Sequence, residues 1–341
     1  MPSLSSYSSA YPSRALLVGY GSIGQRHLRN LRSLTGECSI TVWRHARSMA
    51  ADECLSGANA VVYSESDAVE THPDIAIIAS PAPMHLHAAL GLARAGVHLL
   101  IEKPLSNSLT DIKQLIEVVR QRGLVVMMGY NLRFYEPLRQ ARALLREGCI
   151  GQVLSFRVEV GHYLPEWRTG DYRQSVTARS ELGGGVVLEL SHELEYVEWL
   201  LGPVKSVWAC MAKLSALEIN VEDTAEIMLE CENGVLGSIH LDMIQSPKVR
   251  RCHVVGSDGV LDLDLITHHL RCFSRKRGCW SEISGPQPLD LNETYLSELK
   301  YFLECVGRRT EPEVTLKHGH RVLQIALAVK ESSCTKRVVA L

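Results

Sequence analysis

A glycine-rich stretch near the start of the chain has the residue types and spacing that hold a phosphate. Gly19-Tyr20-Gly21-Ser22-Ile23-Gly24 reads GxGxxG and stands between a short apolar run and an amphipathic helical pattern. In such a loop Gly19 permits a tight turn, Gly21 lets the backbone approach a pyrophosphate, and Gly24 allows close packing of helix on strand. The helix N-terminus, at Ser22 and Ile23, adds N–H donors and a partial positive charge. This predicts a dinucleotide site, the alternative being a glycine-rich turn without a ligand.

The end of the second predicted strand bears on which nicotinamide cofactor this loop binds. An NAD enzyme usually carries Asp or Glu about 20 residues after the glycines, where it bonds the ribose 2′-hydroxyl. The segment 41–47 contains no acid. Arg44, with help from His45 or Arg47, would instead pair with a 2′-phosphate, and Arg26 would add to this positive field. The sequence therefore favours NADP over NAD, unless these are solvated surface cations in an enzyme that accepts either cofactor.

Glu102-Lys103-Pro104 directly follows the apolar run His98–Ile101. The carboxyl ends of parallel strands open onto the ligand crevice, and a lysine there can exchange a proton with a substrate. Pro104 restricts the backbone of Lys103, and Glu102 would hold the ammonium group or anchor the turn. In isolation this tripeptide is typical of a surface turn, so its position in the fold is what indicates a catalytic role.

The elements that position these residues alternate along the first 130 residues. Apolar runs of strand length are separated by helical patterns, including one from Ile23, one at His85–Ala95 and one that starts near Ser108 with a capping box to Asp111. The predicted strands are Ala15–Val18, Ser39–Trp43, Ala60–Tyr63, Ile75–Ala79, His98–Ile101 and Val125–Met128. Continuous apolar strands between helices predict an α/β fold, a Rossmann doubly wound parallel sheet over 14–130. A serine-rich lead-in, 1–13, is expected to be disordered.

The pattern changes to alternating strands near residue 150. After a helix at Tyr135–Glu147, the predicted strands are Gln152–Val160, Val204–Met211, Thr224–Cys231, Val235–Leu241, Arg250–Val255 and Gly259–Leu263, with helices at about Gly185–Leu201, Leu291–Val306 and Gly319–Ser332. Asn233-Gly234 predicts a type I′ hairpin. We assign 131–335 to an α+β domain with an open, mostly antiparallel sheet that serves substrate binding and oligomerisation.

Taken together, these motifs resemble the Gfo/Idh/MocA oxidoreductases (glucose–fructose oxidoreductase, inositol dehydrogenase and relatives). The resemblance covers roughly residues 14–335. It rests on the glycine loop followed by Gln25-Arg26-His27, and on the segments 80–85 (SPAPMH), 102–104 (EKP), 129–134 (GYNLRF) and 183–192 (GGGVVLELSH). It implies a Rossmann domain, a C-terminal domain whose open sheet often forms oligomer contacts, and nicotinamide-dependent oxidation or reduction of a sugar or cyclitol.

The resemblance also implies roles for individual residues. Lys103 matches the family lysine near the reacting hydroxyl, and His192 matches the histidine that accepts or donates the proton with it. The expected cofactor contacts beyond the glycine loop are Ser80, Pro81, His85, Glu102 and Lys103, and the expected substrate wall is Tyr130 and Arg133.

One position departs from the family pattern. Many members have an Asp four residues before the catalytic histidine, but position 188 is Leu and the nearest acid is Glu189, three residues before His192. On a helix both spacings share one face, so Glu189 would substitute for the aspartate. Alternatively Glu189 is a packing acid, and His192 a buried histidine bonded within the core.

A long predicted loop, 161–173, is rich in aromatic and basic residues. Tyr163 and Trp167 can stack on a sugar face or a nucleobase, and Arg168 and Arg173 can hold a phosphate or carboxylate, with Tyr172 beside them. The loop favours a charged or nucleotide-linked sugar as substrate. An oligomer contact or a packing loop is the alternative, since protein interfaces are also rich in aromatic residues and arginine.

Composition excludes several other classes. The 341 residues contain 36 Lys plus Arg and 38 Asp plus Glu, a formal net charge of −2, which argues against a nucleic-acid protein. No apolar run approaches the about 18–20 residues that span a bilayer, and the N-terminus lacks a secretory pattern. Ten cysteines without a CxxC favour a reduced, cytoplasmic chain, and the histidine pairs lack the partners of a metal site.

We therefore expect an NAD(P)(H)-dependent oxidoreductase that acts on a CH–OH group of a sugar derivative and forms a homo-oligomer, a dimer or tetramer. The cofactor carries the hydride while the protein positions and polarises the substrate. One alternative is a non-catalytic, cofactor-sensing regulator on the same fold, against which the presence of both Lys103 and His192 argues. Another is a reductase of a non-sugar substrate such as a dihydrodiol, which would need a more apolar pocket.

Overall fold

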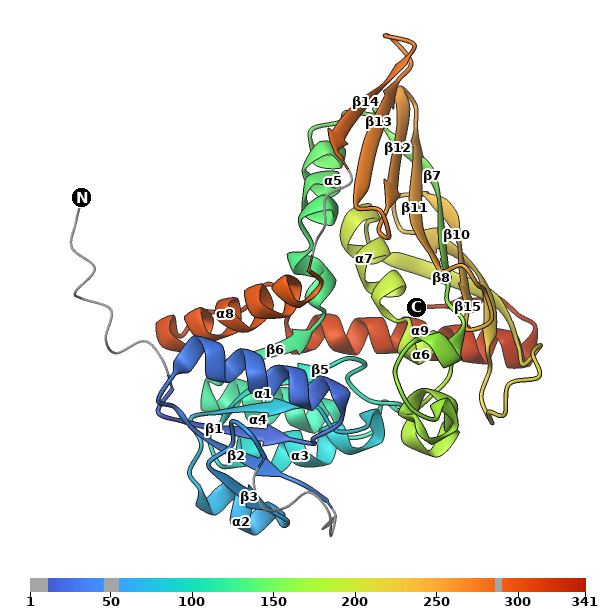
Figure 1. Ribbon diagram of the computed structural model, residues 1–341. Coiled ribbons are helices and arrows are strands. Elements are labelled where there is room, and N and C mark those ends of the chain that lie inside the picture. The colour runs from blue at the N-terminus through green and yellow to red at the C-terminus, as the bar shows by residue number, and fades with distance from the viewer. Residues whose placement is uncertain (1–11, 46–54, 286–289) are drawn as a thin grey trace, which may run out of the picture. The chain divides into compact units, whose positions relative to one another are not determined.

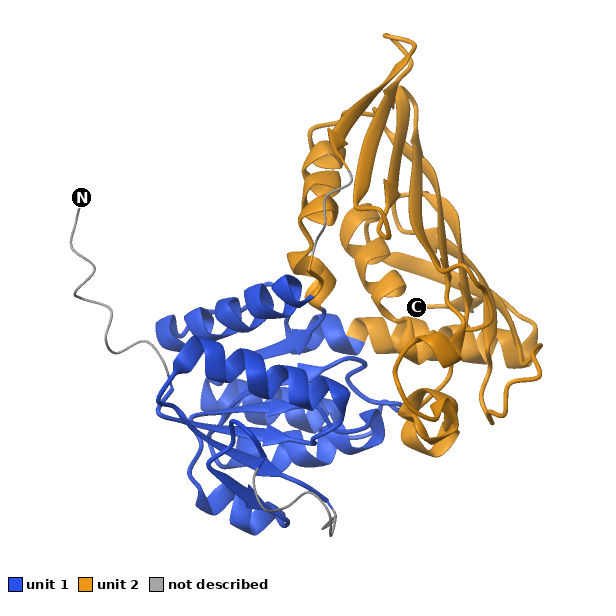
Figure 2. Ribbon diagram, viewed as in Figure 1, with its two compact units in different colours: residues 1–130, 292–320 blue, residues 131–291, 321–341 orange. Residues whose placement is uncertain are grey.

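The computed structural model describes residues 12–45, 55–285 and 290–341, and the chain divides into two compact units (Figure 2). Unit 1 consists of Met1–Tyr130 and Asn292–His320, and unit 2 of Asn131–Leu291 and Arg321–Leu341. This division differs from the expected one because residues 292–320, which we assigned to the second domain, lie in unit 1. Most of the serine-rich lead-in, and Arg47, lie outside the described residues.

Unit 1 contains a six-stranded parallel sheet in the order β3-β2-β1-β4-β5-β6 (Figure 1). Its strands are β1 (Arg14–Val18), β2 (Ser39–Trp43), β3 (Ala60–Val62), β4 (Ile75–Ile78), β5 (His98–Glu102) and β6 (Val126–Gly129). β1, β2, β4, β5 and β6 are almost wholly buried, as expected for a sheet covered on both faces. The chain order reverses between β1 and β4, which puts the ligand crevice of such folds at the carboxyl ends of these strands. The predicted Rossmann sheet is confirmed.

Helices flank the sheet of unit 1, and all but the last of the following connect its strands. They are α1 (Ser22–Thr35), α2 (Glu65–Glu70), α3 (Ala82–Arg94), α4 (Ile112–Arg122) and α8 (Asn292–Arg308). Because parallel crossovers are right-handed, α1 and α3, which lead in opposite directions along the sheet, cover opposite faces. The capping box predicted for α4 is wrong, since Asp111 is in the left-handed region with φ +62° and its side chain makes no cap hydrogen bond.

Helix α8 belongs to unit 1 because its apolar side chains pack there. Leu299, Phe302 and Leu303 are buried, and α8 lies against α1. The Asn292 and Asn30 amides exchange two hydrogen bonds of 3.0 and 3.2 Å across these helices. The periodicity of the α8 sequence predicts a helix, but it does not predict which of the two units the helix packs in.

Unit 2 contains a nine-stranded sheet in the order β14-β13-β12-β11-β7-β10-β9-β8-β15. Its strands are β7 (Val153–Gly161), β8 (Val204–Ala212), β9 (Thr224–Cys231), β10 (Leu236–Asp242), β11 (Val249–Gly256), β12 (Gly259–Asp264), β13 (His269–Ser274), β14 (Cys279–Ser284) and β15 (Val339–Ala340). Only the β7–β10 pair among these neighbours is parallel, so the predicted mostly antiparallel sheet is confirmed. Strands β13, β14 and β15 were not predicted.

One face of this sheet is buried and carries the helices of unit 2. They are α5 (Glu136–Arg146), α6 (Val186–Glu189), α7 (His192–Leu201) and the later part of α9 (Leu316–Thr335), which begins in unit 1. Along β7 the buried residues alternate, Phe156, Val158 and Val160, with more exposed ones between them. The Ser332 and Ser333 hydroxyls of α9 accept hydrogen bonds from backbone N–H groups of β8.

The hairpin between β9 and β10 is present, but its turn is not type I′. Gly234 has φ +83°, whereas Asn233 is not in the left-handed region, and type I′ needs both. The Gly234 N–H donates to the Cys231 carbonyl over 3.0 Å, as in a type I turn closed by a left-handed glycine. The Asn233 amide instead donates to the Leu201 carbonyl at the end of α7, which explains why it keeps an ordinary backbone.

Candidate active site

The glycine loop of unit 1 has a backbone that only glycine fits at two of its three positions. Gly19 has φ +90°, and a Cβ there would lie 2.8 Å from the Ala79 carbonyl oxygen. A Cβ on Gly24 would lie 2.3 Å from the Gly19 carbonyl oxygen. The loop is thus packed against the end of β4 and against itself, which fixes the first turn of α1.

Gly21 differs, because a Cβ there would meet nothing within 4 Å. It is the N-cap residue of α1 and provides no side-chain cap for the helix. The first N–H groups of a helix have no partner inside the helix, so those at Ser22 and Ile23 face a region that a ligand can approach. Open space beside an uncapped helix N-terminus fits a pyrophosphate, as the spacing of the glycines predicts.

The ribose end of the expected cofactor site lies after β2. Arg44 is half-buried, and its backbone N–H donates to the Val62 carbonyl over 3.0 Å. His45 packs on Trp43, with ring centroids 5.4 Å apart. Partial burial, and then the nearby His87, lower the pKa of His45, so its imidazole is mostly neutral at pH 7 and brings little charge to a phosphate.

Arg26 has a partner that the sequence did not indicate. Its guanidinium lies 4.6 Å from the centroid of the Tyr295 ring on α8. This cation–π contact holds the side chain against unit 1's own helix. Arg26, one of the basic residues expected around a 2′-phosphate, therefore already has an aromatic partner within unit 1.

His85 braces two loops instead of presenting a surface to a ligand. Its ring is 1% exposed, with Nδ1 3.0 Å from the Pro104 carbonyl oxygen and Nε2 2.6 Å from the Ser80 carbonyl oxygen. It thus joins the carboxyl ends of β4 and β5, where Pro81 caps the start of α3. We expected the His85 side chain to contact the cofactor. In the structure both of its ring nitrogens instead lie against backbone carbonyl oxygens.

Lys103 is half-buried directly after β5, next to a buried carboxylate. Glu102 is 6% exposed; its Oε1 lies 2.7 Å from His27 Nε2, and its Oε2 accepts from the Lys103 backbone N–H over 3.2 Å. Gly129 on β6 makes room for this side chain, since a Cβ there would lie 3.2 Å from the carboxyl carbon. Of the two roles considered for Glu102, these contacts correspond to the anchor of the turn.

In unit 2, His192 is the first residue of α7 and is 9% exposed. The single helix predicted over Gly185–Leu201 is wrong: α6 ends at Glu189, and Leu190 and Ser191 form a turn before α7. Glu189 and His192 therefore do not lie on one continuous helix. Glu189 Oε2 accepts a hydrogen bond of 3.0 Å from the Thr177 hydroxyl.

The two residues expected to form a substrate wall are buried. Tyr130 has no exposed surface, and Arg133 is 6% exposed. The Arg133 Nε donates to Glu195 Oε1 over 2.5 Å, and its guanidinium lies 4.4 Å from the centroid of the Trp199 ring. In the structure neither residue offers surface to a substrate, because internal packing occupies both.

Glu195 is a buried acid one turn after His192 on α7. Burial raises its pKa to about 7, although the Arg133 guanidinium acts in the opposite direction. Its Oε2 has no hydrogen-bond partner among the described residues. No role was predicted for Glu195, because a Glu in a helical pattern is ordinarily solvated.

The loop after β7 folds into short 3₁₀ turns in place of the unstructured loop we expected. Trp167 stacks on His162 with ring centroids 5.8 Å apart, and its indole N–H donates to the His162 carbonyl. Tyr163 is 36% exposed and Arg168 is exposed. Tyr163 and Arg168 thus remain accessible, while Trp167 is partly engaged in the loop's own packing.

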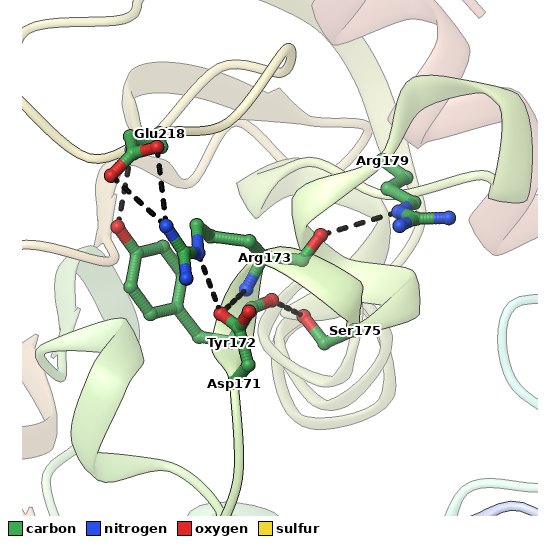
Figure 3. Close-up of polar contacts among 6 residues, drawn as sticks. All are labelled: Asp171, Tyr172, Arg173, Ser175, Arg179 and Glu218. Carbon is green, nitrogen blue, oxygen red and sulfur yellow. Dashed lines mark hydrogen bonds and ion pairs between the residues drawn. The ribbon is translucent and has the colours of Figure 1, made fainter.

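Arg173 is already paired within this loop (Figure 3). Its Nε donates to Asp171 Oδ1 over 2.8 Å, and its Nη1 lies 3.4 Å from both carboxylate oxygens of Glu218. The Tyr172 hydroxyl accepts from the Glu218 backbone N–H over 3.2 Å. Two carboxylates therefore already pair with Arg173. To be bound by Arg173 as we expected, a substrate anion would have to displace Asp171 and Glu218.

The described residues contain no group of three or more His, Cys, Asp or Glu side chains placed to hold a metal ion. Among them, no helix has both the length and the apolarity needed to cross a membrane.

Comparisons with protein-family models identify both parts of the chain. A model described as an oxidoreductase family with an NAD-binding Rossmann fold matches residues 13–130, and one for the GFO/IDH/MocA C-terminal domain matches residues 138–262. These ranges include most of the chain and carry the glycine loop, Lys103 and His192. The chain belongs to the Gfo/Idh/MocA family of oxidoreductases.

Within that family the chain is similar to enzymes of sugars and cyclitols. A myo-inositol 2-dehydrogenase of Thermotoga maritima is 25% identical over 342 residues, which span 95% of this chain and 97% of that protein. A levoglucosan dehydrogenase in complex with NADH has the same fold, with a TM-score of 0.85 and 18% identity over 96% of this chain and 98% of that one. The WlbA dehydrogenase of Bordetella pertussis, in complex with NADH and UDP-GlcNAcA, has a TM-score of 0.81 and 23% identity at the same coverage.

Proposed function

We propose that this protein is an NAD(P)(H)-dependent oxidoreductase that transfers a hydride to or from a sugar derivative. One observation carries the proposal: open space beside Gly21 at the uncapped N-terminus of α1, on the sheet edge where Lys103 follows β5. Membership of an oxidoreductase family with an NAD-binding domain supports it, as do relatives named for inositol and levoglucosan.

In this proposal the glycine loop binds the cofactor pyrophosphate through the first N–H groups of α1. When bound, the nicotinamide ring supplies or accepts the hydride. Lys103 and His192 handle the proton: in oxidation one of them removes it from the substrate hydroxyl, and in reduction one of them donates it to the forming hydroxyl. Either of the two is chemically able to be the base. Glu189, whose Oε2 accepts a hydrogen bond from the Thr177 hydroxyl, remains in the proposal as the acid expected beside His192.

The substrate that we favour carries a negative charge or a nucleotide. Arg168 is exposed on the loop after β7, and Tyr163 presents an aromatic face beside it. A guanidinium binds phosphate or carboxylate oxygens, and a tyrosine ring can stack on a sugar or base. The structural similarity to a dehydrogenase in complex with UDP-GlcNAcA supports this choice.

We propose that NADP is preferred to NAD, on the basis of Arg44 after β2 and the lack of an acid there. Arg44→Ala is expected to raise the dissociation constant of NADPH about tenfold, since a charged hydrogen bond contributes about 1.5–3 kcal/mol. The dissociation constant of NADH should change less than twofold. Tighter binding of NADH than of NADPH to the wild type would contradict the proposal.

A homo-oligomer, a dimer or tetramer, is also part of the proposal. Trp208 on β8, Met228 on β9 and Leu236 on β10 are each more than 40% exposed on the outer face of the sheet in unit 2. Adjacent exposed apolar side chains favour a protein contact. Light scattering coupled to size-exclusion chromatography measures the mass, and a monomer at micromolar concentration would refute it. The free cysteines of the described residues are in keeping with a cytoplasmic location.

The decisive experiment measures turnover and binding separately. Wild type and Lys103→Ala are incubated with NAD(H) or NADP(H) and a panel of inositols, anhydrosugars, sugar acids and nucleotide sugars, and absorbance is followed at 340 nm. We expect turnover by the wild type, at least a hundredfold loss in the variant, and cofactor affinity within a few-fold of wild type. Cofactor binding without turnover on any compound would instead favour a cofactor-sensing regulator.

A further inference from the structure

Unit 1 buries a histidine and two carboxyl groups beside the strand end that carries Lys103. His27 on α1 has no exposed surface, Glu102 at the end of β5 is 6% exposed, and Glu298 on α8 is fully buried. The mechanism proposed above uses none of these three side chains directly. Three titratable groups in one core are costly to bury, so their arrangement calls for a physical reason.

The contact between His27 and Glu102 is the closest in this group. His27 Nε2 lies 2.7 Å from Glu102 Oε1, a distance typical of a hydrogen bond to a carboxylate. His27 Nδ1 has no hydrogen-bond partner among the described residues. A neutral ring with its proton on Nε2 satisfies the bond to Glu102 and leaves no buried N–H without an acceptor, whereas an imidazolium would leave one.

Two further side chains of α8, Tyr295 and Glu298, belong to the surroundings of this contact. The Tyr295 ring of α8 meets the His27 ring edge to face at 6.1 Å, and Arg26 covers that tyrosine. Burial, and then the Glu102 charge, raise the pKa of Glu298 well above its ordinary value, which favours the neutral form of Glu298. His27 on α1 is the hydrogen-bond partner of Glu102 Oε1.

Glu102 also contacts the backbone of Lys103. Its second oxygen accepts from the Lys103 backbone N–H, and the side chain fits against Gly129 of β6. His27 stands one turn after the glycine loop on α1. The hydrogen bond from His27 therefore links the helix that begins at the glycine loop to the backbone that carries Lys103.

We propose that His27 is a positioning residue that fixes Lys103 relative to the glycine loop, by holding the Glu102 carboxylate from helix α1. This rests on the proposed function for the part that Lys103 plays in proton transfer. Glutamine at position 27 can place an amide N–H near the site of Nε2 and keep the bond to Glu102. Asparagine is polar but too short to reach it, and leucine removes the donor.

The test compares His27→Gln, His27→Asn and His27→Leu with the wild type by two readouts. The first is kcat against pH with the best substrate from the panel, together with the NADH dissociation constant. The second is the rate at which acetic anhydride labels Lys103 between pH 7 and 11, measured by mass spectrometry against the exposed Lys213 as internal reference. The labelling readout needs no turnover, so it decides the positioning role even if no sugar is a substrate.

We expect His27→Asn and His27→Leu to lower kcat at least tenfold, to change the NADH dissociation constant less than threefold, and to alter the relative labelling of Lys103 at least threefold. His27→Gln should restore both readouts to within threefold of the wild type. If His27→Leu does not fold, the comparison of His27→Asn with His27→Gln still shows whether the length of the side chain matters or only its polarity.

His98→Leu is the matched control. His98 is 5% exposed at the first residue of β5, and its Nδ1 accepts from the Val125 N–H over 2.8 Å. The control should lose thermal stability and leave Lys103 labelling unchanged. Unaltered labelling in His27→Asn, equal defects in the glutamine and asparagine variants, or an equal shift in the control would overturn the proposal.

Discussion

Replacing Glu195 with glutamine should make the protein progressively more stable than the wild type as the pH rises from about 4.5 to 7. Glu195 is 1% exposed, and its environment disfavours ionisation in spite of Arg133. In the unfolded chain the carboxyl group ionises near its ordinary value of 4.5, whereas in the folded protein its pKa is about 7. Between these values the folded state binds one more proton than the unfolded state, so wild-type stability falls as pH rises.

The size of the effect follows from that difference in pKa. A shift of about 2.5 units at about 1.36 kcal/mol per unit corresponds to about 3 kcal/mol, reached at and above pH 7. Glutamine does not ionise, and its amide oxygen can still accept the hydrogen bond from Arg133. Below pH 4.5 both variants are neutral at position 195, and their stabilities should differ little.

The assay is urea unfolding of both proteins at half-unit pH steps from 4.5 to 8, followed by circular dichroism. The difference in unfolding free energy between variant and wild type cancels the titration of all other groups. Glu218→Gln is measured beside it as a control, since Glu218 is 71% exposed in its side chain. A flat curve for Glu195→Gln, or one that falls with pH, would mean that Glu195 is ionised throughout as the partner of Arg133.

Further predictions concern four other positions. Alanine at Gly24 should lower the melting temperature because its Cβ would lie 2.3 Å from a carbonyl oxygen, whereas Gly21→Ala should melt like the wild type and bind NADH more weakly in a fluorescence titration. The bonds to Asp242 and Glu226 raise the pKa of His240 to about 9, so the stability that the charged His240 contributes is complete below pH 6.5 and is lost as the pH passes 9. In urea unfolding, His240→Gln should therefore lower the stability at pH 6 but change it little at pH 10. Arg173→Gln should cost less than about 1 kcal/mol in the same assay, since exposed ion pairs contribute little, and a larger loss would contradict this account.

The strands of unit 1 were predictable because nearly every residue in them is apolar. The predicted second strand, Ser39–Trp43, coincides with β2, and the other five differ by one residue at one or both ends. In a parallel sheet covered on both faces, burial alone determines which residues are apolar. Glycines such as Gly123, which ends α4 with φ +60°, mark helix ends, because glycine adopts this left-handed backbone without strain.

Two of the strands of unit 2 that were missed are short: β13 alternates buried and more exposed residues over six positions, and β14 has no buried residue. Arg271 on β13 ion-pairs with Asp262 on β12, and its guanidinium lies 4.4 Å from the Trp280 ring on β14. These cross-strand contacts stabilise β13 and β14, but each joins side chains of two different strands. A pattern read along one segment contains no signal for a partner that arrives from another strand.

The same limit applied to the site residues. Positions that depend on the backbone, Gly19, Gly24 and Lys103 after β5, were predicted from local order alone. Arg133 and Arg173 had the right residue types for binding an anion, but Glu195 and Glu218 already occupy them. Residue type predicts what a side chain can bind, while only the fold shows whether a protein group has bound it first.

Glu189 and His27 show two further limits of a local pattern. Spacing alone made Glu189 a partner of His192, but the turn at Leu190–Ser191 interrupts the helix on which that argument depends. His27 is part of a motif, yet it received no role, because its acceptor Glu102 lies 75 residues further along the chain. If the His27→Gln variant retains Lys103 reactivity and His27→Asn does not, the acid–base site of this family member depends on a hydrogen bond between two elements that no local pattern connects.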